Sequence, residues 1–176
     1  MKKISVVLLA LVALVAPYAE AKTCYGTSCN YIDTNAGFQN PNPGDNWSKD
    51  PGVTFPSATW CLNTSVVASL DNTEAIWRFP FVDDSYSDFK LRFRAYLVDD
   101  TDNFYDELKI TVKNRDTGIS ETMTLHGSSF DNCEQDFINF ELDNDYSYSD
   151  VTVTFESGTF SSHAWQIDDV SFFAYY

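Results

Sequence analysis

The sequence predicts an all-β protein, built as a two-sheet antiparallel β-sandwich. Apolar and polar residues alternate with a period of two along several segments, as expected of half-buried strands. No segment has the 3.6-residue period of a convincing amphipathic helix. Short strands separated by turn residues are typical of sandwiches, and 176 residues with ample aromatic and aliphatic material suit one core.

The amino terminus has the features of a signal peptide. Lys2 and Lys3 precede an apolar run over 4–15, and Ala19-Glu20-Ala21 supplies the small residues that a signal peptidase reads. We expect residues 1–21 to be removed and 22–176 to form a single domain. The run is shorter than the about 20 residues of a membrane-spanning helix. The sequence therefore predicts a secreted protein, extracellular or periplasmic, without membrane insertion.

Four cysteines lie in the expected mature part, at Cys24, Cys29, Cys61 and Cys133. An even number in an exported chain favours disulfides over metal thiolates. Three pairings are possible. Cys24 and Cys29 are near enough in sequence to close a local loop, which leaves Cys61 and Cys133 for a long-range bond that would stabilise the fold more.

Strands follow a surface loop that we expect over 35–57, where Pro41-Asn42-Pro43-Gly44-Asp45 marks a turn. In the segment 89–97, the alternating apolar residues from Phe89 to Leu97 occupy one face, and Lys90, Arg92, Arg94 and Tyr96 occupy the other. The turns lie at 99–103, at 116–118 and at Gly158. The predicted strands run over 89–97, 108–112, 121–125, 151–156 and 165–172.

The charge is strongly acidic, with 26 Asp and Glu against 11 Lys and Arg and a formal net charge of −15. Such a chain repels nucleic acid and anionic lipid, so neither is an expected partner. Its basic residues gather in the middle of the sequence. Arg92, Arg94, Lys109 and Lys113 are interpreted as a basic stripe that docks an acidic partner or an anionic polysaccharide, or pairs with carboxylates across strands.

The last predicted strand carries two adjacent carboxylates, Asp168 and Asp169, within an apolar run from Trp165 to Phe172. A charge beside a core is costly unless it is paired, hydrogen-bonded or bound to a metal. The pair therefore suggests an ion site or a polar latch that closes the fold.

Several segments, taken in order, resemble a known family. Asn35-Ala36-Gly37-Phe38-Gln39 followed by Trp47 looks like the opening of many carbohydrate-binding-module jelly rolls. The hairpin region over 89–112 is similar to the middle of those galactose-binding-like modules and of MAM-like domains, and 165–172 resembles their closing strand. The resemblance covers most of the mature chain and implies a sandwich that binds carbohydrate.

The resemblance also implies a structural calcium ion between the opening and closing strands. By position its ligands would be Gln39 and Asp168, with backbone carbonyls and Asp33 or Asp169 completing the shell. Calcium takes six to eight oxygen ligands, and Gln39 stands where the resemblance leads us to expect Glu. The alternative is that Asp168 caps backbone amides at a bulge and binds no metal.

Sugar recognition in such folds rests on exposed aromatic rings bracketed by polar groups. The alternative for each ring is ordinary packing, and we assign Trp60, Trp77 and Trp165 to the core. The candidate ligand-binding residues are Tyr96, Arg92 and Arg94 on the sheet face, and Trp47, Tyr86 and Tyr105 in loops.

Catalysis has little support in the sequence. The two histidines, His126 and His163, are interpreted as surface residues, and no nucleophile elbow or metalloprotease motif is present. We therefore expect a non-catalytic protein that binds a glycan or a cell-surface or matrix component. The alternatives are an adhesion, matrix or host-interaction protein that meets another protein through its sheet face, and a small secreted hydrolase. The oligomeric state is left open.

Overall fold

The structure is a computed structural model of the whole chain. It describes residues 29–35, 38, 47–57, 66–98, 106–127, 137–159 and 163–176. Within 29–35, Ile32 is the residue whose side chain is described. None of the described residues lies in an α-helix.

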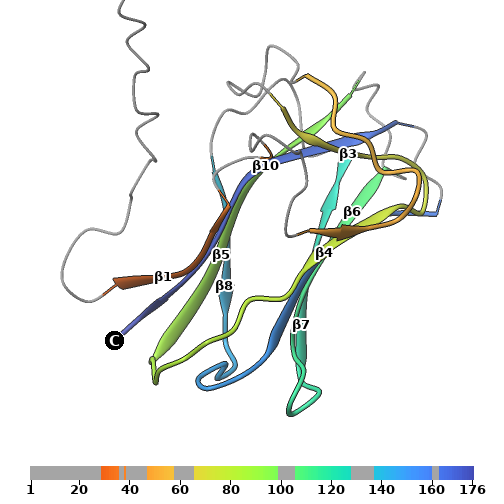
Figure 1. The fold of residues 1–176 in the computed structure, drawn as a ribbon. Helices are drawn as coiled ribbons and strands as arrows, with labels where there is room; N and C mark the ends of the chain where they lie inside the picture. The colour runs from red at the N-terminus through yellow and green to blue at the C-terminus, as the bar shows by residue number, and fades with distance from the viewer. Residues whose placement is uncertain are drawn as a thin grey trace, which may run out of the picture.

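The described strands form two sheets that face each other (Figure 1), and every pairing is antiparallel. The first sheet has the order β1 (Cys29–Asn35), β10 (Trp165–Tyr175), β5 (Asp88–Leu97) and β8 (Ile138–Leu142), with β3 (Ala68–Leu70) paired to β10. The second sheet has the order β2 (Ser48–Lys49), β4 (Ala75–Arg78), β9 (Val151–Ser157), β6 (Glu107–Asn114) and β7 (Ser120–His126). The predicted fold class, an all-β antiparallel sandwich, is confirmed.

The alternating pattern of the long strands builds the core. In β5 every second residue from Phe89 to Leu97 is buried, and β6 and β9 contribute Ile110 and Phe155 in the same way. Aromatic rings of the two sheets meet there, with the Phe93 and Phe155 centroids 5.1 Å apart in an edge-to-face arrangement. The side chains that alternate with these point outward, and on β5 they include Lys90, Arg92 and Arg94.

The basic stripe predicted from the sequence is wrong. Arg92 and Arg94 lie on β5 in the first sheet, whereas Lys109 and Lys113 lie on β6 in the second. Because the two outer faces of a sandwich point in opposite directions, these four cations form two separate groups.

The closing strand β10 contains a β-bulge at the predicted carboxylate pair. Its register against β5 shifts between Asp168 and Ser171, and Asp169 has a φ of 51°. Asp168 is fully buried, while Asp169 is half-buried. The bulge proposed in the sequence interpretation is therefore present.

Short strands also occur outside the strand ranges predicted from the sequence. β2 lies inside the segment 35–57 that we expected to be loop, and β3 and β4 follow it. Among the described residues, no helix has the length and apolar character needed to cross a bilayer.

Candidate functional site

Three aromatic side chains lie in line on the outer face of the second sheet. Ile76 of β4 is fully buried in the core, so its neighbour Trp77 points outward and is half-buried. The alternation continues past the end of the strand. Phe79 is 51% exposed and Phe81 is 58% exposed, while Pro80 between them is buried. We call Trp77, Phe79 and Phe81 the aromatic strip.

The strip is long enough to contact an extended ligand. Residues two apart on a strand are about 6.6 Å apart, so three alternating residues extend roughly 13 Å. Soluble proteins rarely expose several large apolar side chains side by side without a binding role. The order Trp-Arg-Phe-Pro-Phe over 77–81 is the signal that a sequence reading could have used.

Hydroxyl groups lie beside the strip. Across the sheet, Trp77 pairs with Thr154, Thr154 with Thr111 and Thr111 with Thr122. These residues occupy the same outward row, and the hydroxyls of Thr111 and Thr122 are 3.3 Å apart. We call Thr154, Thr111 and Thr122 the threonine row. It offers uncharged donors and acceptors next to an aromatic ring.

The turn after β6 supports the exposed end of the strip. The Arg115 guanidinium lies 5.2 Å from the centroid of the Phe79 ring. Phe81 forms a β-bridge with Asp150, whose backbone N–H donates to the Asp116 carboxylate at 2.9 Å. These contacts hold the two phenylalanines in place although their rings are exposed.

The outer face of the first sheet has a different chemistry. The guanidinium groups of Arg92 and Arg94 lie 3.4 and 4.4 Å from the centroid of one ring, Phe137. Tyr96 is half-buried further along β5. The structure thus places the predicted residues Arg92, Arg94 and Tyr96 together on one face.

Beside this stack is an open hollow of about 290 Å³. Lys90 lies at its edge and forms an ion pair with Glu141. Burial alone lowers the pKa of Lys90, but the Glu141 carboxylate outweighs burial, so the pKa is raised above its ordinary value. The hollow is lined by Lys90, Arg92, Phe137, Asn139, Phe173 and Tyr175.

Two other predicted ligand-binding rings belong to the core. Trp47 is 8% exposed and packs 6.2 Å from Phe155 between ring centroids, and Tyr86 is 9% exposed and packs edge-on against Phe89. Neither ring can stack on a sugar, so both predictions are wrong. Tyr105 lies outside the described residues.

The three tryptophans assigned to the core have different outcomes. Trp165 is fully buried, as predicted. Trp77 faces outward in the aromatic strip, so its assignment to the core is wrong. Trp60 lies outside the described residues.

The predicted calcium ligands are only partly within the described residues. Asp168 is fully buried, which suits a carboxylate that neutralises an ion. The Asp169 carboxylate lies 3.3 Å from Nε of Arg94, so it faces a cation of the protein itself and fits a metal shell poorly. Gln39 lies outside the described residues, and so does the side chain of Asp33. Within the described ranges, no three His, Cys, Asp or Glu side chains gather as a metal site would require.

Most of the cysteines for which we predict disulfides lie outside the residues that the structure describes. Cys24, Cys61 and Cys133 are not among the described residues, and Cys29 contributes its backbone as the first residue of β1. The disulfide pairing stays a prediction.

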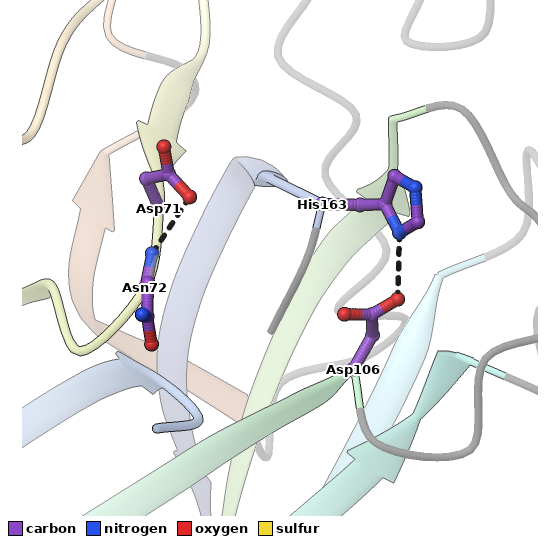
Figure 2. Close-up of polar contacts among 4 residues, drawn as sticks. All are labelled: Asp71, Asn72, Asp106 and His163. Carbon is purple, nitrogen blue, oxygen red and sulfur yellow. Dashed lines mark hydrogen bonds and ion pairs between the residues drawn. The ribbon is translucent and has the colours of Figure 1, made fainter. Parts of the chain in front are cut away.

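One histidine is bound to a buried acid. His163 Nδ1 contacts Oδ2 of Asp106 (Figure 2), at a distance of 2.8 Å. Asp106 is fully buried. His126 lies 3.4 Å from the more exposed carboxylate of Glu107. Both histidines are half-buried, so His163 in particular is less of a surface residue than we predicted. Because Asp106 precedes β6 and His163 precedes β10, their bond joins the two sheets at one end of the sandwich.

An acid–histidine pair is also part of hydrolytic triads. A triad further needs a nucleophile held by the second ring nitrogen and an oxyanion hole. Figure 2 shows Asp71 and Asn72 to one side of the pair, bonded to each other through the Asn72 backbone N–H at 2.8 Å. Of the four residues drawn, Asp71 and Asn72 carry a carboxylate and an amide, and neither group is the nucleophile of a Ser-His-Asp triad. What the described residues show for Asp106 and His163 is a bond between the two sheets.

Several solved structures with a similar fold are carbohydrate-binding modules. TmCBM61, determined in complex with beta-1,4-galactotriose, aligns with a TM-score of 0.57 at 16% identity over 82% of this chain and 99% of that one. The xylan-binding module CBM15 aligns with a TM-score of 0.56 at 12% identity, covering 85% and 97% of the two chains. The CBM22-1 xylan-binding domain of Paenibacillus barcinonensis Xyn10C aligns at 0.52 and 13% identity, covering 85% and 97%.

The fold is therefore that of a carbohydrate-binding-module jelly roll, as the sequence resemblance implied. Some similar chains are enzymes, but the match to the MgGH51 α-L-arabinofuranosidase covers 27% of that chain. No protein-family model matches the sequence, and no curated protein matches it. At these identities the similarity establishes the fold, and the ligand has to be argued from the side chains.

Proposed function

We propose that this chain is a secreted, non-catalytic glycan-binding protein that binds an oligosaccharide chain along the aromatic strip. The observation that carries the proposal is the line of three outward-facing rings, Trp77, Phe79 and Phe81, on an otherwise polar sheet face. The solved structures with the same fold include one in complex with galactotriose and two described as xylan-binding.

The chemistry of the strip suits a neutral sugar chain. A pyranose ring has an apolar face of C–H groups and a polar edge of hydroxyls, so it can stack on an aromatic ring while it hydrogen-bonds sideways. Trp77 provides the stacking face next to the threonine row, and Phe79 and Phe81 extend it along the strand. Because rings and hydroxyls are uncharged, binding should depend little on salt.

Single ring deletions test the proposal. Glycans that bind on an array are titrated against Trp77→Ala and Phe79→Ala by calorimetry. Truncating an aromatic anchor costs about 2 kcal/mol, which weakens the affinity about 30-fold. Tyr176→Ala is the matched control, because Tyr176 is 58% exposed, like Phe81, but it directly follows β10 of the first sheet.

Two results would overturn the proposal. One is an array on which no neutral glycan binds the wild-type protein. The other is unchanged affinity in both strip variants, with folding checked by thermal unfolding. If Tyr176→Ala weakens binding as much as Trp77→Ala, the site lies at the end of the sandwich and the strip is not its centre.

A further inference from the structure

The hollow on the first sheet lies on the opposite side of the sandwich from the aromatic strip. It is formed by residues of β5, β8 and β10, whereas the strip follows β4 of the second sheet. A ligand in the hollow therefore cannot contact the strip, and the two surfaces require separate explanations.

The charge of the hollow contrasts with that of the molecule. The chain has a formal net charge of −15. Of the described side chains that line the hollow, Lys90 and Arg92 are cations and none is Asp or Glu. The hollow thus brings two cations together on a protein of negative net charge, and such a place can attract an anion.

The arginines are held in position for an anion. Arg92 and Arg94 stack on the same Phe137 ring at 3.4 and 4.4 Å, which brings two like charges close together. Asp169 compensates Arg94 at 3.3 Å. Desolvation raises the pKa of Asp169, although both arginines act to lower it. A stacked guanidinium has lost much of its rotational freedom already, so it costs less to order on binding.

Lys90 gives the hollow a second cation. Its ammonium lies 6.0 Å from the Phe173 ring centroid and 5.6 Å from that of Tyr175, and its partner Glu141 is 64% exposed. An ion pair with so exposed a carboxylate contributes little, so an incoming anion can share Lys90 at small cost.

We propose that this hollow is a second binding site that takes the carboxylate of an acidic sugar residue. Arg92 presents the planar fork that matches a carboxylate, and Lys90 adds a point charge. The rings of Phe137 and Tyr175 and the amide of Asn139 border the same space, as a sugar ring needs. The volume of about 290 Å³ lies at the small end of ligand pockets, which suits one sugar unit of a chain.

The test measures binding of oligogalacturonate, with beta-1,4-galactotriose and poly-glutamate as the neutral and the acidic-peptide comparisons. We expect oligogalacturonate to bind, and its affinity to fall as salt rises. Arg92→Gln should weaken this binding about tenfold or more, because a charged hydrogen-bond donor is lost. Lys113→Gln removes the same charge from the opposite sheet and should leave the affinity unchanged.

Two further variants distinguish a failure of this proposal from a loss of folding and from a failure of the proposed neutral-glycan site. Arg92→Lys keeps the charge without the fork and should lose part of the affinity, while thermal unfolding verifies that both Arg92 variants fold. Trp77→Ala should weaken binding to neutral glycans and leave oligogalacturonate binding intact. The experiments can therefore refute one proposed binding site without refuting the other.

The proposal is overturned if oligogalacturonate does not bind, or if Arg92→Gln and Lys113→Gln have the same effect. Equal or tighter binding of poly-glutamate, lost in Arg92→Gln, would overturn the sugar assignment and make the hollow a site for an acidic peptide.

Discussion

Glu121 is predicted to hold the loop that supports the exposed end of the aromatic strip. Its carboxylate accepts hydrogen bonds from the backbone N–H of Asp143 at 2.8 Å and of Asn144 at 2.9 Å, and from the Tyr146 hydroxyl at 3.0 Å. Tyr146 is fully buried. The same loop leads to Asp150, the bridge partner of Phe81, so Glu121 connects β7 to the binding surface.

The magnitude follows from these three hydrogen bonds. At about 1 kcal/mol each they would contribute roughly 3 kcal/mol, and solvent screening of a half-buried carboxylate reduces this to about 2 kcal/mol. We expect Glu121→Ala to lower the free energy of unfolding by that amount in urea titrations at neutral pH. Glu141→Ala is the control, because Glu141 is 64% exposed in its ion pair and should cost less than about 1 kcal/mol.

The pH dependence gives an independent check. Burial acts to raise the pKa of Glu121, but the hydrogen bonds from Asp143 and Asn144 outweigh it and hold the pKa below its ordinary value of 4.5. The stabilisation is therefore complete above that ordinary value and is lost as the pH falls through the lower pKa of the folded state. Glu121→Ala should lack this component of acid unfolding. A loss of stability no greater than in Glu141→Ala, or an unchanged acid transition, would refute the reasoning.

Three further predictions concern the ends and faces of the sandwich. His163→Ala removes the histidine bound to the buried Asp106 and should lower the free energy of unfolding in urea by about 2 kcal/mol. His126→Ala should lower it by less than about 0.5 kcal/mol, and equal losses in the two variants would contradict this. If the predicted calcium site exists, the melting temperature should rise with calcium and fall with chelator, and in Asp168→Asn it should respond to neither. An unchanged melting temperature at saturating calcium would contradict the site. Calorimetry of Trp77→Ala combined with Phe81→Ala should give additive losses of affinity, because the residues are about 13 Å apart along the chain, and strong coupling would refute independent stacking.

The long strands could be predicted from sequence because they are long enough to display their period. The alternation over 89–97 recurs as β5, and the segments 151–156 and 165–172 recur within β9 and β10. β3 has three residues and β4 has four, which are too few for a period to be distinguished from chance. Short strands of this kind are set by their neighbours in the sheet.

The aromatic strip was missed because a charged residue faces inward. Arg78 is half-buried, and its guanidinium lies 5.9 Å from the centroid of the buried Trp47 ring. The usual expectation is that a charged residue faces solvent and a tryptophan faces the core. Applied to this short strand, that expectation assigns Trp77 and Arg78 to the wrong faces. The long arginine side chain makes the inversion possible, because its apolar stem can pack while the charged end meets an aromatic face.

The error in the basic stripe has a different origin. A period of two assigns the side chains of one strand to two faces, but it does not say to which sheet the next strand belongs. Successive long strands of this chain, β5 and β6, enter different sheets. Arg92 and Lys109 therefore face opposite directions although each was correctly placed on the polar face of its own strand.

Asp169, one of the two adjacent carboxylates of β10, is connected to the arginines beside the hollow. A bulge sets two residues of one strand against one residue of the other, and Asp169 adopts a φ of 51°, which Asp tolerates better than β-branched residues do. This conformation brings its carboxylate to Arg94, next to the Phe137 stack. Asp169→Val should therefore disturb both the bulge and the arginines, whereas Asp169→Asn should keep the backbone and remove the charge that compensates Arg94. If the hollow binds anions, Asp169→Asn should bind oligogalacturonate more tightly than the wild type, and weaker binding would contradict this connection.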